Sequence, residues 1–234
     1  MEEWVNYSEK ISRLLDLEKM PVSVCFTNEK PEGIDPGHAS FCQAIKLAAQ
    51  GQVFLIDKEH SVCPGGTWHC GLSKPPEGQS KRAIQKFLTS GEKLTASIVS
   101  FHRMSSLAAP PPTDLSEYVY ICPLEKSVIK PDLAVLICNP EQACRLITLD
   151  IYWDGVPPKI ELAGSLCHSV IAYPVTTGNT NLSFGDWTAR RMQGFEKEDV
   201  FLSIPFERMK NLMEAIPRCS AGTASFTGFE EPNA

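Results

Sequence analysis

The sequence has no run of lysine or arginine and no long apolar segment. It carries 22 basic and 28 acidic side chains over 234 residues, a net charge of −6. A nucleic-acid groove needs clustered positive charge, so that partner is disfavoured. No segment approaches the roughly 18 apolar residues of a membrane helix, and the N-terminus lacks the basic and apolar regions of a secretory signal. We expect a cytoplasmic protein with neither nucleic acid nor a membrane as partner.

Several motifs of common enzymes are also missing. The sequence contains no G-x-S-x-G elbow, no P-loop and no H-E-x-x-H. It also lacks G-x-G-x-x-G, which makes a nicotinamide-binding Rossmann site improbable. These absences leave open whether the protein is an enzyme.

Cysteine, by contrast, is plentiful. The chain has nine, an odd number, and no export signal, so a disulfide framework is not expected. Cys25 and Cys138 lie in apolar, strand-like runs and are interpreted as core residues. The function is therefore sought among the remaining cysteines.

The hydrophobic pattern predicts an α/β fold, with a mixed α+β arrangement as the alternative. The expected strands cover residues 21–26, 53–56, 118–122, 132–137, 182–184 and 200–204. The expected helices cover residues 3–18, 39–49, 81–88, 140–151, 161–173 and 206–216. A Gly-rich loop is expected at residues 61–71, and a strand or a helix end at residues 96–101.

The order of these elements suggests two pseudo-repeated halves that share one core. Each half has a strand, an Asn, a Pro, a helix with an apolar-Cys pair, a Gly, a second strand and a Gly-containing loop, so that Cys42 and Cys167 hold matching places. The predicted organisation is an N-terminal half, a Pro-rich crossing segment, a C-terminal half and a loose tail, at residues 1–107, 108–117, 118–218 and 219–234.

The strongest local motif is Cys63-Pro-Gly-Gly-Thr-Trp-His-Cys70. Its C-x6-C spacing matches neither a zinc ribbon nor a ferredoxin, so a metal site here must collect ligands from distant points. Cys42 begins a predicted helix, where the macrodipole stabilises a thiolate, and Cys167 occupies the corresponding place. The predicted set is Cys42, Cys63 and Cys167 with Cys70 or Cys122 as the fourth. Four thiolates suit a [4Fe–4S] cluster or, alternatively, zinc.

Two other interpretations remain open. In one, the protein is a metal-free thiol enzyme, and the nucleophile pairs Cys42, Cys63 or Cys167 with His60, His69 or His168. In the other, it is a binding module for a small anionic ligand or cofactor, held by Gly65, Gly66, Asp186 and Arg190. In the motif Phe184-Gly-Asp-Trp-Thr-Ala-Arg-Arg191, Asp186 is expected to orient Arg190 or Arg191 through a charge-assisted hydrogen bond. The alternative for this motif is a turn with a surface ion pair.

In combination, several of these motifs resemble a known family. They are Phe41-Cys-Gln-Ala, Cys63-Pro-Gly-Gly, Pro131-Asp-Leu-Ala-Val-Leu-Ile-Cys-Asn-Pro140, Cys167-His-Ser-Val, Phe184-Gly-Asp, Arg190 or Arg191, and Ser203-Ile-Pro205. The sequence resembles the prokaryotic domain-of-unknown-function family 169 from about residue 14 to residue 216. The resemblance implies a cytoplasmic protein of a bacterium or archaeon, favours Cys42, Cys63 and Cys167, and implies no settled activity.

We therefore predict a cysteine-ligated metal protein, with a [4Fe–4S] cluster between the two halves. Its expected role is redox chemistry or electron transfer in anaerobic metabolism, with a redox protein or a small molecule as partner.

Overall fold

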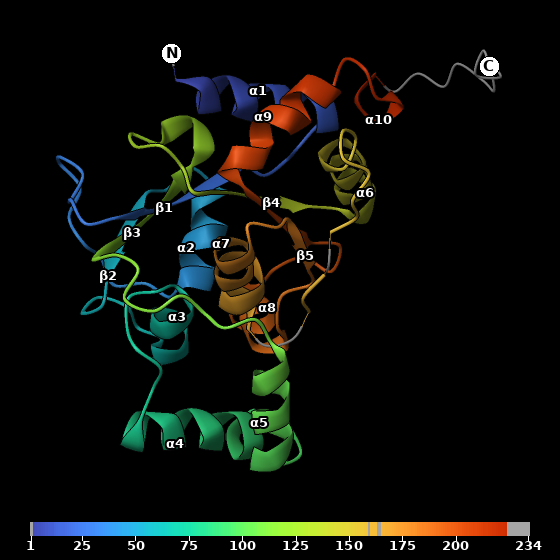
Figure 1. Ribbon diagram of the computed structural model, residues 1–234. Coiled ribbons are helices and arrows are strands. Elements are labelled where there is room, and N and C mark those ends of the chain that lie inside the picture. The colour runs from blue at the N-terminus through green and yellow to red at the C-terminus, as the bar shows by residue number, and fades with distance from the viewer. Residues whose placement is uncertain (1, 159, 163–164, 224–234) are drawn as a thin grey trace.

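The protein folds into one β-sheet with helices packed around it (Figure 1). The structure is a computed structural model, and it describes residues 2–158, 160–162 and 165–223. The strands are β1 (Val22–Thr27), β2 (Phe54–Asp57), β3 (Tyr118–Pro123), β4 (Leu133–Cys138), β5 (Asn181–Ser183) and β6 (Val200–Pro205). The α-helices are α1 (Glu3–Leu15), α2 (Phe41–Ala48), α3 (Pro64–His69), α4 (Gly78–Lys86), α5 (Ile98–Leu107), α6 (Pro140–Asp150), α7 (Tyr173–Thr177), α8 (Trp187–Gln193), α9 (Phe206–Ala215) and α10 (Ser220–Thr223). Two π-helical segments are η1 (Phe87–Gly91) and η3 (His168–Ala172), and one 3₁₀ turn is η2 (Leu124–Lys126).

The strands form one six-stranded sheet in the order β2-β3-β1-β4-β6-β5, and every pairing is antiparallel. The predicted α/β fold class is thereby confirmed. The sheet order sets β2-β3-β1 beside β4-β6-β5, and β3, which follows the predicted crossing segment, lies between β2 and β1 of the N-terminal half. Repetition between the two halves stays a prediction.

Helices cover both faces of the sheet. Figure 1 places α1 and α9 above it and α2, α3, α7 and α8 below it. Side chains alternate along each strand, so neighbouring residues enter different cores. Val119 and Ile121 of β3 pack into the lower core with α2, whereas Tyr120 and Cys122 pack on the upper side with Cys25.

Most expected strands and helices are found within one or two residues of their predicted limits, while the helix expected at residues 3–18 ends at Leu15 and the one expected at residues 81–88 begins at Gly78. Three other segments differ more. Residues 61–71 contain helix α3 in place of a loop. Pro64 suits the first turn of that helix, and the Cys63 thiol accepts a hydrogen bond from the Gly66 N–H at 3.4 Å, so both residues favour a helix start. The segment around residue 96 leads into α5, because the Ser97 hydroxyl caps it by accepting from the Ser100 N–H at 3.1 Å.

The helix expected over residues 161–173 is also modified. Its described part begins at Leu166, widens into the π-type turn η3, and continues as α7 to Thr177. Residues 163 and 164 lie outside the described parts. Of the tail from residue 219, the short helix α10 is described, and residues 224–234 lie outside the description.

Two further features lie outside the sheet and the helices that cover it, a proline-rich segment and a helical hairpin. The proline strap, residues 108–112, lies along η3 and α7, where the Ala109 carbonyl contacts His168 Nε2 at 2.7 Å and the Pro110 carbonyl accepts from Thr176 at 3.0 Å. The second feature is the hairpin, residues 78–107, formed by α4, η1 and α5, which Figure 1 shows as a separate layer below the body. Among the described residues, no helix is long and apolar enough to cross a membrane.

Candidate functional site

Cysteines stand at the starts of three helical segments below the sheet. Cys42 is the second residue of α2, which the Ser40 hydroxyl caps by accepting from the Gln43 N–H at 3.3 Å. Cys167 is the second residue after Ser165, whose hydroxyl likewise accepts from the His168 N–H at 3.2 Å. Cys63 itself caps α3, through the hydrogen bond from Gly66. Helix starts carry partial positive charge, which favours a thiolate over a thiol.

The structure brings Cys42, Cys63, Cys70 and Cys167 together, and we call these four the cysteine cluster. Each pair among them interacts electrostatically, and the side chains of Cys70 and Cys167 are hydrogen-bond partners. Cys70, which follows the last residue of α3, and Cys167 are buried in the lower core, and Cys42 packs against it. Cys42 and Cys63 are half-buried, so the cluster extends from the core toward the surface.

Gly66 permits this approach. A methyl group added at Gly66 would stand 3.6 Å from Sγ of Cys167 and 3.1 Å from Cδ2 of Phe41. The second distance is tighter than nine in ten real contacts of that kind. The absence of a side chain at this position therefore lets α3 lie directly against Cys167 and the start of α2.

The environment of Cys42, Cys70 and Cys167 favours the protonated form of these three thiols. Burial, followed by the nearby Cys167, raises the pKa of Cys42 to about 12. Burial also raises the pKa of Cys70, and the hydrogen bond with Cys70, followed by burial, raises the pKa of Cys167 well above its ordinary value. The negative charge of Asp186 adds to the rise in pKa at both Cys42 and Cys167. A bound cation would reverse this balance, because it favours the thiolate form.

Across residues 2–158, 160–162 and 165–223, no group of three or more His, Cys, Asp or Glu side chains is arranged so that it could hold a metal ion. The four thiols are thus neighbours without forming a closed shell around one point. Assigning them as metal ligands stays a prediction.

Cys122 lies elsewhere. It is on the upper side of β3, where its thiol is 3.1 Å from the Ser23 hydroxyl, and it shares a small buried group with Cys25 and Tyr120. Of the two candidates for a fourth cluster member, the structure therefore places Cys70 with the other three. Cys25 and Cys138 are buried, as expected of core residues.

The two histidines nearest the cluster in sequence belong to a row of aromatic rings. The His69 ring stacks on Trp68 at 4.8 Å between ring centres and meets His168 edge-on at 5.4 Å. Burial, followed by the neighbouring His168, lowers the pKa of His69 to about 3, so the imidazole is neutral near pH 7. His60 is paired with Asp57, at 2.7 Å.

The motif around Asp186 has a structural explanation. The Asp186 carboxylate caps α8 by accepting from the Ala189 N–H at 2.8 Å, and it also accepts from the Leu166 N–H at 2.7 Å. Asp186 therefore fixes the start of the segment that carries Cys167, and the expectation that it orients an arginine is wrong. Arg191 pairs instead with Glu92, at 2.7 Å.

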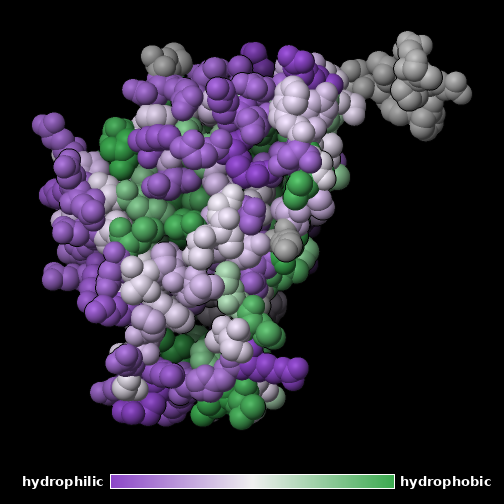
Figure 2. All heavy atoms as spheres, in the orientation of Figure 1, coloured by the Kyte–Doolittle hydropathy of each residue, from purple (hydrophilic) through white to green (hydrophobic). Residues whose placement is uncertain are grey.

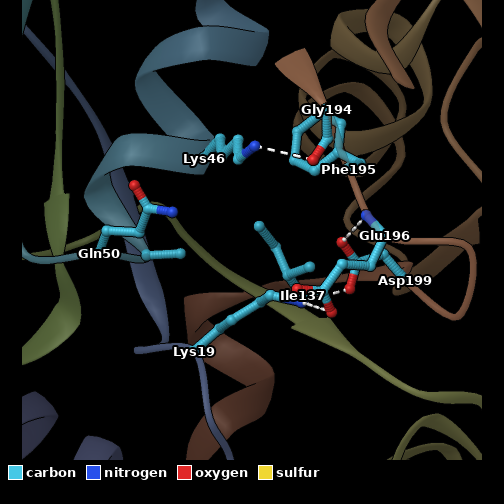
Figure 3. Close-up of a pocket in the computed structure, with 9 residues that line it drawn as sticks. Lys19, Lys46, Gln50, Ile137, Gly194, Phe195, Glu196 and Asp199 are labelled. Carbon is cyan, nitrogen blue, oxygen red and sulfur yellow. Dashed lines mark hydrogen bonds and ion pairs between the residues drawn. The ribbon is translucent and has the colours of Figure 1, made fainter. Parts of the chain in front are cut away.

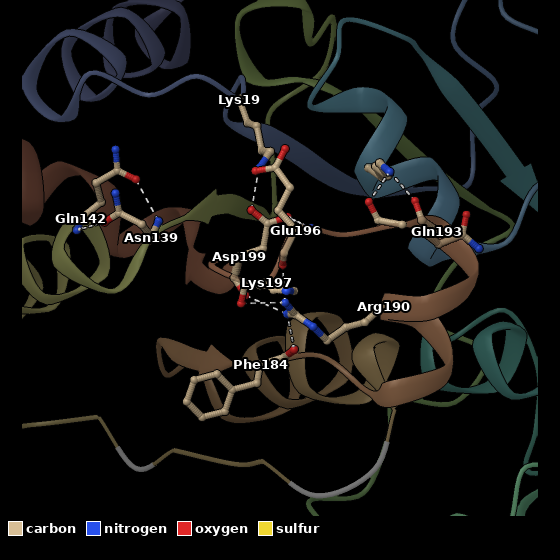
Figure 4. A network of polar contacts seen from close by, with 11 residues as sticks. Lys19, Asn139, Gln142, Phe184, Arg190, Gln193, Glu196, Lys197 and Asp199 are labelled. Atoms are coloured by element: carbon tan, nitrogen blue, oxygen red, sulfur yellow. Dashed lines mark hydrogen bonds and ion pairs between the residues drawn. The ribbon is translucent and has the colours of Figure 1, made fainter.

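The guanidinium of Arg190 donates hydrogen bonds to four backbone carbonyl oxygens. Figure 4 shows its guanidinium directed at a ring of carbonyl oxygens, and it donates to those of Phe184 and Asp199 at 2.9 and 2.8 Å and to those of Glu196 and Lys197. These bonds occupy the donors that an anionic ligand would need. Gly65, in contrast, has open space around it, with nothing within 4 Å of an added methyl group.

A polar cavity of about 90 Å³ lies between α2 and the loop before β6, away from the cysteines. Figure 3 shows Lys19 and Lys46 entering it from opposite sides. Lys19 pairs with Asp199 at 2.5 Å and with Glu196 at 2.9 Å, while Lys46 donates to the carbonyls of Gln193 and Gly194. Since both ammonium groups are matched by protein acceptors, the cavity does not present an uncompensated positive charge.

Ser40 and Ser165 are parts of the site that the sequence reasoning did not identify, and Asp186 was identified for another role, as a binder of an anionic ligand. A signal for Ser40 was present, because it lies two residues before Cys42 near a predicted helix start, and serine is a preferred helix cap. Ser165 lies inside the helix predicted over residues 161–173, so its capping role had no such signal. The effect of Asp186 on Cys42 and Cys167 has no local signal, because it depends on chain segments that meet only after folding.

Comparisons with known proteins match nearly the whole chain. Residues 10–215 match the model of a family, DUF169, that is described as "Uncharacterised ArCR, COG2043". The chain is also similar to the uncharacterised protein MJ0308 of the archaeon Methanocaldococcus jannaschii, with 26% identity over 221 residues, which cover 89% of this chain and 91% of that protein. No solved structure matches the chain. Since the family model spans both halves of the sheet and all four residues of the cysteine cluster, the chain belongs to the DUF169 family.

Proposed function

We propose that the protein binds a metal cofactor through the cysteine cluster, and that this cofactor is a [4Fe–4S] cluster. The observation that carries the proposal is the meeting of Cys42, Cys63, Cys70 and Cys167, which come from three helical segments spread over the chain. Free thiols in a core need no such convergence, since one buried cysteine packs as well as another small apolar residue. Four cysteine thiolates are the usual ligand set of a [4Fe–4S] cluster.

The chemistry of the four groups supports a cationic occupant. Without it, burial and mutual repulsion raise the pKa of Cys42 to about 12. With it, all four can ionise, and the positive ends of the helix starts and the added cation together compensate the charge. When bound, such a cluster would supply one-electron redox chemistry.

Four cysteine thiolates fit two metal occupants, a [4Fe–4S] cluster and a zinc ion. In a [4Fe–4S] cluster each cysteine sulfur binds a different iron atom, so the sulfurs stand farther apart than four ligands of one zinc ion. Zinc stays the alternative occupant, and metal analysis separates the two.

The proposed role is electron transfer or another redox reaction. Cys42 and Cys63 are half-buried, so the cluster has a side near the surface from which a redox protein or a small molecule could exchange electrons.

The metal-free thiol enzyme has less support. A nucleophilic cysteine needs a lowered pKa or an adjacent base, whereas the pKa values of Cys42, Cys70 and Cys167 are all raised. The nearby His69, with a pKa of about 3, is a weak base. The anion-binding module loses its main cation, because Arg190 is bound to carbonyl oxygens.

The test is anaerobic purification of the full chain followed by measurement of iron, acid-labile sulfide, zinc and the visible spectrum. For one [4Fe–4S] cluster per chain we expect about four iron atoms and about four sulfides, together with a broad absorption band at about 400 nm. Protein without iron and sulfide, both as purified and after anaerobic supply of ferrous iron and sulfide, would contradict the proposal. Stoichiometric zinc in place of iron would replace the cluster by the alternative occupant.

Single Cys→Ser variants locate the ligands. Substitution of Cys42, Cys63, Cys70 or Cys167 should lower the iron content and bleach the spectrum. Cys25→Ser and Cys122→Ser are matched controls, since both thiols are completely buried but lie on the other side of the sheet. Equal iron loss in the controls and in the four test variants would mean that the effect is one of folding and not of ligation.

A further inference from the structure

The hairpin differs from the rest of the molecule in its burial. Residues 78–107 are all described, and none of them is buried. On α5, Val99 and Leu107 are each 76% exposed, and they lie two helical turns apart with the exposed Arg103 between them. Ile98 and Phe87 are about half exposed. Most of the thirty residues of the hairpin therefore lie in helices although none of them is buried, and the side chains of Val99 and Leu107 make an exposed apolar stripe on α5.

The hairpin is attached to the body by few polar contacts. Glu92 accepts from both Arg191 and Thr188 of α8, at 2.7 and 3.3 Å. Within the hairpin, Gln85 and His102 are 3.0 Å apart. Ordering a residue costs about 1–2 kcal/mol of backbone entropy, and burial of apolar surface is what usually offsets it. An additional contact over the outward face would supply that burial.

Charge distinguishes among the surfaces that could provide this contact. The hairpin holds five of the 22 basic side chains and one of the 28 acidic ones, so it carries a net charge of +4 and the remainder of the chain −10. Two hairpins facing each other would repel. A hairpin against the body of a second copy brings opposite net charges together, and such complementarity guides association.

We propose that the protein forms a two-fold dimer in which the hairpin of each copy docks on the acidic body of the other. The contact combines an apolar stripe, Val99 and Leu107, with the arginine and lysines that flank it. Aliphatic side chains next to arginine are suited to the buried part and rim of a protein interface. Figure 2 shows hydrophobic and hydrophilic side chains mixed in this way on the layer that α4 and α5 form at the bottom of the view. This inference does not depend on the metal proposal.

The test measures the mass of the full chain by sedimentation equilibrium, at about 50 mM and about 500 mM NaCl. We expect a dimer at low salt, and a dissociation constant at least roughly tenfold higher at high salt, because screening weakens the attraction between opposite charges. A monomer at both salt concentrations overturns the proposal. A dimer that tightens with salt also overturns it, since that is the response of two like-charged hairpins facing each other.

Variants assign the contact to the hairpin. The double variant V99E/L107E and the triple variant K81E/R82E/K86E should each raise the dissociation constant at least roughly tenfold. The matched controls are V128E/V156E, at residues 64% and 62% exposed, and K10E/K58E/K210E, at exposed lysines outside the hairpin. Unchanged thermal melting would show that the variants fold. A dimer unaffected by the hairpin variants, or weakened equally by the controls, overturns the proposal.

A basic amphipathic hairpin is also able to bind anionic lipid, so the experiment includes a second arm. The wild-type protein is sedimented with vesicles of phosphatidylglycerol and, separately, of phosphatidylcholine. The proposal expects no binding to either. Binding to the phosphatidylglycerol vesicles that V99E/L107E abolishes, together with a monomer in solution, would assign the hairpin to a membrane surface in place of a second copy.

Discussion

The two adjacent glycines of α3 allow a sharp test of how the cysteine cluster is packed. Alanine at either position gains helix propensity, about 0.5–1 kcal/mol in a helix interior and less near the first turn. At Gly65 nothing lies within 4 Å of the added methyl group, so Gly65→Ala should be neutral or slightly stabilising. At Gly66 the methyl group would stand 3.1 Å from Cδ2 of Phe41, whose side chain is completely buried in the lower core.

Overpacking of a core costs about 1–3 kcal/mol. After subtraction of the helix gain, Gly66→Ala should lower the free energy of unfolding by about 0–2 kcal/mol, and should fall about 1–3 kcal/mol below Gly65→Ala. Relief of the close contact with Phe41, the residue next to Cys42, would shift α3 and the two cysteines at its ends, so iron content should decrease in the Gly66 variant and not in the Gly65 variant.

Urea unfolding followed by circular dichroism gives the stability of both variants under the same conditions, and iron analysis of anaerobically purified protein gives the occupancy. The reasoning would be refuted by a Gly66→Ala protein that is as stable as Gly65→Ala and carries the same amount of iron. That result would mean that α3 does not press against Phe41 and Cys167 as described.

Three further predictions concern individual side chains. The pKa of His69 falls to about 3 on folding, so the unfolded chain takes up a proton between about pH 6.5 and 3 and the folded chain does not. This residue therefore lowers the free energy of unfolding as the pH falls, by up to ~1.4 kcal/mol per pH unit. His69→Gln should lose less stability than the wild type between pH 7 and 4.5 in urea titrations, and an equal loss in both proteins would contradict the assignment. Arg190→Lys keeps the positive charge but removes the guanidinium N–H groups that donate to four carbonyl oxygens, so it should lower the free energy of unfolding by about 2–3 kcal/mol. A decrease in melting temperature no larger than that of the control Arg191→Lys would contradict this role. Asp186→Ala removes the acceptor of two backbone N–H groups and should cost about 1–3 kcal/mol, with Asp186→Asn retaining part of that stability in the same melting experiment.

The strands and most helices were predictable because their signals are local. Alternation, apolar runs and bounding prolines predict the strand at residues 118–122 almost as it is found. Helix α3 was missed because paired glycines favour a loop, and the contact of Gly66 with Phe41, which gives this segment its place, is made between residues that are 25 positions apart.

The candidate site was predictable in part. The helix-start position of Cys42 follows from the sequence pattern, whereas Cys167 lay inside the helix predicted over residues 161–173 and was selected by its correspondence with Cys42. The structure does bring both residues together with Cys63. Whether Cys70 or Cys122 joins them depends on which face of β3 looks toward α2, and alternation alone does not reveal that. The roles of Asp186 and Arg190 were beyond sequence reasoning, because their partners are backbone groups of other segments.

The pairing of β2 with β3 has a consequence for how the protein is divided. Asp57 at the end of β2 lies directly opposite Tyr118 at the start of β3, although sixty residues separate them. Everything between those two residues is therefore an excursion that leaves the sheet and returns to it at one place. That excursion brings Cys63 and Cys70, while the sheet-bound helices bring Cys42 and Cys167. A cofactor held by all four would fasten the excursion to the body near its start, and so add to the ties that the proline strap and Glu92 make farther along it.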